Sequence, residues 1–105
     1  MPDQEPPLYD VEQALHMLAR NRRRSDPVTR QTILIADKLA THMARHFTAA
    51  QADAAGRALV IAAGSVGTIA VHGSDPLGMA SINVIAYAGH RLVLDAAAAT
   101  EVAGG

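Results

Sequence analysis

Two histidines four residues apart are the pair in this sequence best placed to bind a metal. His42 and His46 lie in a stretch whose apolar residues recur at helical spacing, and this spacing brings two side chains to one face of a helix. Two such imidazoles can bind one divalent metal ion. A third ligand would have to come from elsewhere in the chain, and the spacing also suits two boundary residues with one nitrogen in water. A divalent metal at His42 and His46 is therefore an alternative, and the sequence predicts no other cofactor.

Arginines gather in one short segment, where four of the five positions from 20 to 24 are Arg and another follows at position 30. One or two arginines at the end of a helix complement the helix dipole, but this run exceeds that need. Guanidinium groups make bidentate contacts with phosphates and carboxylates. We therefore predict an anionic partner, either nucleic acid or an acidic protein surface. The candidate binding residues are Arg20, Arg22, Arg23, Arg24 and Arg30.

The residues needed for catalysis do not form a recognisable pattern. The chain has no Cys, which removes disulfides, thiolate metal sites and cysteine nucleophiles. Ser65 lies in a Gly-Ser-Val-Gly sequence that differs from the nucleophile elbow of hydrolases. The aspartates Asp53, Asp75 and Asp95 are too widely spaced to be recognised as a carboxylate pair. The sequence thus indicates no catalytic residue and favours a non-catalytic protein.

Length and composition restrict the fold that must position these residues. A chain of 105 residues forms one domain. It is 50% hydrophobic but only 3% aromatic, and 22 residues are Ala. Because alanine buries little area, the core must be built by close approach of backbones. The net charge of −1 implies no general attraction to nucleic acid or membranes.

Two stretches without formal charge, 58–74 and 76–90, are shorter than the roughly 20 apolar residues of a membrane span. We read them as buried helices and expect no membrane-spanning segment. Residues 1–7 are acidic and proline-rich, which differs from a signal peptide. Together with the lack of Cys, this favours a cytoplasmic protein.

Helix start signals divide the chain into four parts. Ser-Asp-Pro occurs at 25–27 and again at 74–76, and Thr48 with Gln51 has the form of a capping box. Helices are expected at about 8–22, 27–47, 49–72 and 76–99. An alternative reads 59–63, 68–71, 82–87 and 91–95 as short buried strands, but alanine is a poor strand former. We predict an all-α, compact bundle of about four antiparallel helices with an Ala/Gly-rich core. Residues 1–7 and 101–105 are expected to be flexible, on either side of a single domain at 8–100.

Two helical faces are expected to be buried. In the second helix, the apolar face carries Val28, Ile35, Leu39, Met43 and Phe47. The third helix has a narrow stripe of small residues and is also apolar on the opposite side. A helix that is apolar on two sides needs cover on both, and a second subunit can supply it. The predicted self-association residues are Ala52, Gly56, Ala63, Gly67 and Ala70.

The sequence favours a small helical interaction or oligomerisation module that binds itself, as a homodimer, and a protein partner. Two alternatives stay open. One is a DNA-binding transcriptional regulator that uses the basic run from Arg20 to Arg24. The other is a small histidine-metal protein or enzyme.

Overall fold

The computed structural model describes the backbone of residues 10–73 and 76–104 and the side chains of residues 10–66 and 78–102. The described residues form four helices, α1 (Val11–Asn21), α2 (Pro27–Ala44), α3 (Ala49–Gly73) and α4 (Pro76–Gly104). The all-α prediction is confirmed. Because the described residues contain no strand, the alternative with short strands is wrong. Helix α4 continues through residues 101–104, where we expected a tail.

The helix starts follow the capping chemistry of the sequence. The carboxylate of Asp26 accepts a hydrogen bond from the backbone N–H of Thr29 at 3.0 Å, with Pro27 in the first turn. Thr48 and Gln51 form the expected reciprocal capping box, with distances of 3.0 and 3.2 Å. Asp10, which we did not anticipate as a cap, accepts from the N–H of Gln13 and starts α1. In the second Ser-Asp-Pro signal, residues 74 and 75 lie outside the described residues. Helix α4 begins at the proline of this signal, Pro76.

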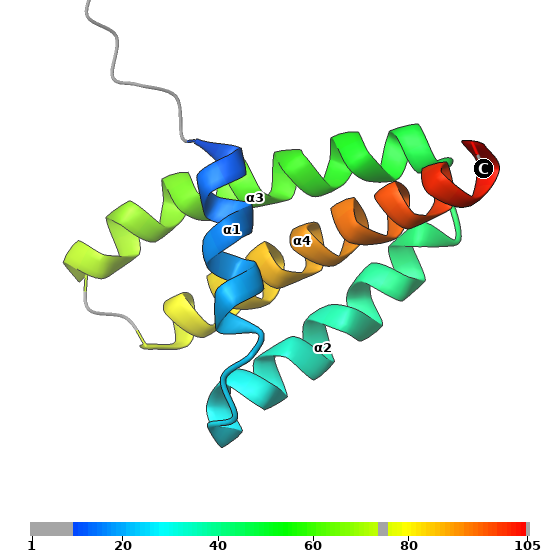
Figure 1. Ribbon diagram of the computed structural model, residues 1–105. Coiled ribbons are helices and arrows are strands. Elements are labelled where there is room, and N and C mark those ends of the chain that lie inside the picture. The colour runs from blue at the N-terminus through cyan, green and yellow to red at the C-terminus, as the bar shows by residue number, and fades with distance from the viewer. Residues whose placement is uncertain (1–9, 74–75, 105) are drawn as a thin grey trace, which may run out of the picture.

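Helix α4 lies at the centre of the arrangement (Figure 1). It runs antiparallel to α3 along one side, while α2 lies along its other side and points in the same general direction as α4. Helix α2 thus packs mainly against α4 rather than against α3, its neighbour in sequence. Helix α1 crosses over α3 and α4 on one face. The molecule is 24 Å thick against 45 and 42 Å in the other directions, which corresponds to about two layers of helices.

A pair of glycines sets the separation of α3 and α4. A Cβ atom on Gly56 would lie 2.5 Å from the carbonyl oxygen of Gly89, and a Cβ on Gly89 would lie equally close to the carbonyl oxygen of Gly56. Neither position can therefore carry a side chain without moving the helices apart. Close contact with another helix thus explains the glycine at position 56, inside α3.

The core beside this crossing consists mostly of alanine. Among the side chains that the structure describes, Leu92 and Val60 are the largest that are fully buried. One cluster of buried residues joins α2, α3 and α4, and comprises Ala36, Ala40, Ala52, Tyr87, Ala88, Leu92 and Ala96. Small side chains at these positions allow the three helices to approach closely, as the composition predicted.

Helix α2 is turned differently from our expectation. Its buried residues are Ala36 and Ala40, whereas Val28, Ile35 and Leu39 are exposed. The prediction that these three side chains and Phe47 lie in the core is therefore wrong for the single chain, although Met43 packs at its edge. The physical reason is the close approach of α2 to α4, which only the alanine side of α2 permits.

Candidate functional site

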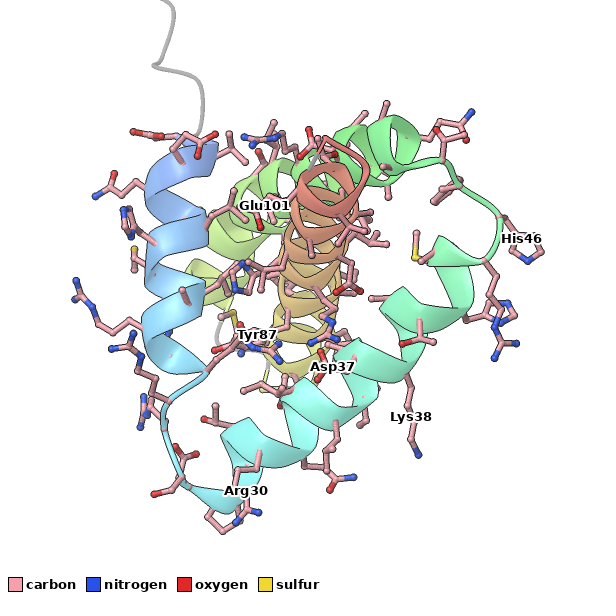
Figure 2. The ribbon with its side chains drawn as sticks, turned by 45° about the vertical axis from the view of Figure 1, so that its right-hand side comes forward. Arg30, Asp37, Lys38, His46, Tyr87 and Glu101 are labelled. Carbon is pink, nitrogen blue, oxygen red and sulfur yellow. The ribbon has the colours of Figure 1, made fainter. Side chains whose placement is uncertain are left out.

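The arginine run divides into residues with structural roles and residues that are free. Both terminal nitrogens of Arg22 donate to the Asp37 carboxylate at 3.2 Å, a bidentate pair that ties the end of α1 to α2. Figure 2 shows Asp37 directed toward the interior between the helices, in contrast to Lys38, which points away. Arg22 is only 21% exposed. Arg22 therefore has a structural role, because its guanidinium group is already engaged by Asp37.

Arg24 forms an ion pair with the N-cap residue Asp26 at 3.1 Å. Hydrogen bonds from the hydroxyl and the N–H of Thr29, together with the charge of Arg24, lower the pKa of Asp26. Arg20, Arg23 and Arg30 are exposed and form no ion pair with any described side chain. Of the five predicted anion-binding residues, these three keep their full hydrogen-bonding capacity.

A pocket of about 280 Å³ opens where α1 ends and α2 begins. Arg22 and Arg24 lie on its α1 side, and Arg30 comes from the first turn of α2. Ile33 and Leu34 supply an apolar wall, and Ser25 completes the lining. The fold therefore brings Arg22, Arg24 and Arg30 to one cavity, whereas Arg20 and Arg23 lie outside its lining.

The predicted self-association stripe is largely covered within the chain. Ala52, Gly56 and Ala63 are buried, and Gly56 makes the tight contact with Gly89 of α4. Gly67 and Ala70 lie among the residues whose side chains are not described. A second copy could reach Gly56 only if α3 and α4 separated.

The histidine pair is exposed at the end of α2 and just after it. The ring centroids of His42 and His46 are 5.9 Å apart in an edge-to-face arrangement, and His46 points away from the other helices in Figure 2. Among the described residues, no group of three His, Asp or Glu side chains is close enough to hold a metal ion. The structure thus brings the two histidines together but adds no described third ligand.

The burial of one histidine was not anticipated from the sequence. His90 on α4 is 3% exposed, and neither ring nitrogen has a hydrogen-bond partner among the described residues. Burial lowers the pKa of His90, and the charges of Arg22 and Arg91 act in the same direction, whereas Asp37 on α2 opposes them. The signal for this burial in the sequence was the position of His90 at the end of the uncharged stretch 76–90.

Stability should therefore depend on pH through His90. Its pKa is lower in the folded state than its ordinary value of 6.5, so the unfolded chain binds the proton more readily. Well above pH 6.5 the imidazole is neutral in both states, and the full free energy of unfolding is retained. As the pH falls below 6.5 toward the folded-state pKa, the free energy of unfolding decreases, with a slope of at most about 1.4 kcal/mol per pH unit. Urea titrations from about pH 7 to about pH 5 measure this slope.

In His90→Leu, which cannot titrate, this contribution to the pH dependence of the free energy of unfolding should be lost. His46→Leu removes an exposed imidazole and serves as the control for the loss of one histidine. A His90→Leu protein with an unchanged slope would contradict the assignment.

The exposed side of α2 forms an apolar surface feature. Together with the start of α4 it encloses a groove of about 460 Å³. None of the side chains that line the groove is ionisable: they are Pro27, Val28, Gln31, Thr32, Ile35, Ala80, Ser81 and Val84. A groove of this volume is in the range of binding sites, and its lining selects for apolar groups.

No protein-family model, curated protein or solved structure matches this chain. Within the described part of the chain, none of the helices combines the length and the hydrophobicity needed to cross a membrane.

Proposed function

We propose that this protein is a non-catalytic helical interaction module that pairs with a second copy of itself through the exposed face of α2. One observation carries the proposal: α2 buries alanines, whereas its larger side chains Val28, Ile35 and Leu39 are exposed. Val28 is 76% exposed and Ile35 is 47% exposed. Full burial of such a side chain stabilises by about 1.5–3 kcal/mol. In the single chain these side chains remain in contact with water, so most of this stabilisation is not gained.

A second copy fits this face for two reasons. The groove beside Ile35 has no charged lining residue, so two copies of it meet without charge repulsion. In a twofold symmetric dimer each contact occurs twice, so the apolar area that one helical face buries is counted twice in the interface. The α2 face of one chain would then fill the groove of the other. This replaces the stripe on α3 as the proposed dimer contact.

Comparing two isoleucines tests the proposal. Ile35 on α2 and Ile61 on α3 are 47% and 40% exposed, respectively, and only Ile35 lines the groove. Ile35→Gln should raise the dimer dissociation constant at least about tenfold, since the change occurs twice in the dimer. Ile61→Gln should leave it within about twofold. Sedimentation velocity over a concentration series measures both constants, and circular dichroism checks that each variant is helical.

A wild-type chain that stays monomeric at high micromolar concentration would overturn the proposal. Equal effects of Ile35→Gln and Ile61→Gln would also count against the α2 face. The DNA-binding alternative stays a prediction that rests on Arg20, Arg23 and Arg30. It is tested by the salt dependence of duplex binding, which is steep when arginines displace counterions.

A further inference from the structure

The pocket between the end of α1 and the start of α2 is a second surface feature, separate from the apolar groove. Arg30 follows Val28 by two residues and therefore lies about 160° away around α2. The pocket and the groove thus occupy opposite flanks of the same helix. A ligand can therefore bind in the pocket whether or not the groove is occupied by a second copy of the chain.

Two of the three arginines in this pocket are held in place. Arg22 is fixed by its bidentate pair with Asp37, and Arg24 by its ion pair with Asp26. Such fixed guanidinium groups lose less side-chain freedom when a ligand binds. Arg30 has no ion-pair partner among the described side chains and is exposed. Its fork of donors is available to a ligand anion.

The charges around the pocket suit a single negative charge. Arg22, Arg24 and Arg30 contribute three positive charges, and Asp26 and Asp37 neutralise two of them. The remaining charge of +1 matches one carboxylate. A phosphate monoester carries a charge of about −1.5 to −2 and would lie near two aspartates that repel it.

The pocket wall adds a second requirement. Ile33 and Leu34 line the cavity beside the arginines, and Leu34 belongs to the exposed hydrophobic residues. An aliphatic side chain next to the carboxylate would cover them. Arginine matches a planar carboxylate through two parallel hydrogen bonds, and burial of the aliphatic group adds the apolar contribution.

We propose that the pocket formed by Arg22, Arg24, Arg30, Ile33 and Leu34 binds an acidic peptide segment in which a Glu or Asp stands next to a large aliphatic residue. Arg30 provides the free guanidinium that the carboxylate engages. Arg22 and Arg24 set the positive potential, and Leu34 contacts the aliphatic side chain. The partner is a protein with such an exposed segment.

The test uses the full chain and the capped tetrapeptide Gly-Leu-Glu-Gly as the probe. Titration is followed by the arginine Nε–H signals in nitrogen-15 NMR spectra, which report the guanidinium groups directly. Saturable shifts of the Arg30 signal are expected. The neutral peptide Gly-Leu-Gln-Gly should bind at least about tenfold more weakly, since it lacks the charge-assisted hydrogen bonds. Gly-Ala-Glu-Gly should also bind more weakly, because it covers less apolar surface.

Matched variants locate the site. Arg30→Gln should weaken binding of Gly-Leu-Glu-Gly at least about tenfold. Arg23→Gln removes an equal charge outside the pocket lining and should change binding by no more than about twofold. Both residues are exposed, so both variants should keep the wild-type helical spectrum and melting temperature.

Several results would overturn the proposal. Absence of saturable binding of the peptide is one, and equal weakening by Arg30→Gln and Arg23→Gln is another, since it would mean a diffuse basic surface. Tighter binding of inorganic phosphate than of the peptide would identify an oxyanion site. Tighter, strongly salt-dependent binding of a short DNA duplex would identify a nucleic-acid surface. Loss of dimerisation in Ile35→Gln leaves all these outcomes unchanged.

Discussion

Replacing Gly56 by alanine is expected to destabilise the protein by about 2–3 kcal/mol, although alanine is the better helix former by about 1 kcal/mol. The added Cβ would lie 2.5 Å from the Gly89 carbonyl oxygen and 2.9 Å from Cγ2 of Val93. The first of these atoms belongs to the backbone of a packed helix and cannot rotate away. Helices α3 and α4 must therefore move apart and lose contacts along the crossing.

Urea denaturation at one fixed protein concentration measures this effect, which corresponds to a decrease in melting temperature of about 10 °C. Gly89→Ala should give a similar loss, because the contact is reciprocal. Ala58→Leu, which adds a larger group at an exposed position of α3, should change stability by no more than about 0.5 kcal/mol. A Gly56→Ala protein that is more stable than the wild type would show that helix propensity outweighs the crossing.

Truncation of Leu92 to alanine should cost about 3–5 kcal/mol, a large share of the 5–15 kcal/mol that typically stabilises a domain. Leu92 on α4 is 0% exposed and belongs to a cluster whose other members are mostly alanines. Alanine side chains have no rotamers with which to fill the cavity. The site therefore cannot relax well, which places the cost at the upper end of the range for such truncations.

Leu94 provides the matched control, since it lies two residues away on the same helix and is 45% exposed. Leu94→Ala should cost less than about 1 kcal/mol. Denaturant midpoints and slopes of both variants distinguish a true change in stability from loss of cooperativity. Similar losses in Leu92→Ala and Leu94→Ala would mean that α4 is not the central helix of the core.

Local chemistry could be predicted well from this sequence, because it depends on neighbours along the chain. Asp26 with Pro27, and Thr48 with Gln51, act as the helix starts that their residue types indicate. The candidate site could be predicted from the sequence only in part. The arginine run is visible as a cluster, but its division into Arg22, fixed by Asp37, and Arg30, free of any described ion pair, requires the position of α2.

The sequence by itself thus determined the helical class, the helix starts and the need for close packing, which follow from capping groups, periodicity and alanine content. Only the tertiary structure decided which faces meet. The periodicity of α2 assigned Val28, Ile35 and Leu39 to the core, yet the alanine side of α2 faces α4. The contact of Gly56 with Gly89 likewise joins residues far apart in the chain. An apolar stripe shows that a helix face can be buried. Which helix packs against that face depends on the shapes of all the helices together, and this cannot be derived from residues close together in the sequence.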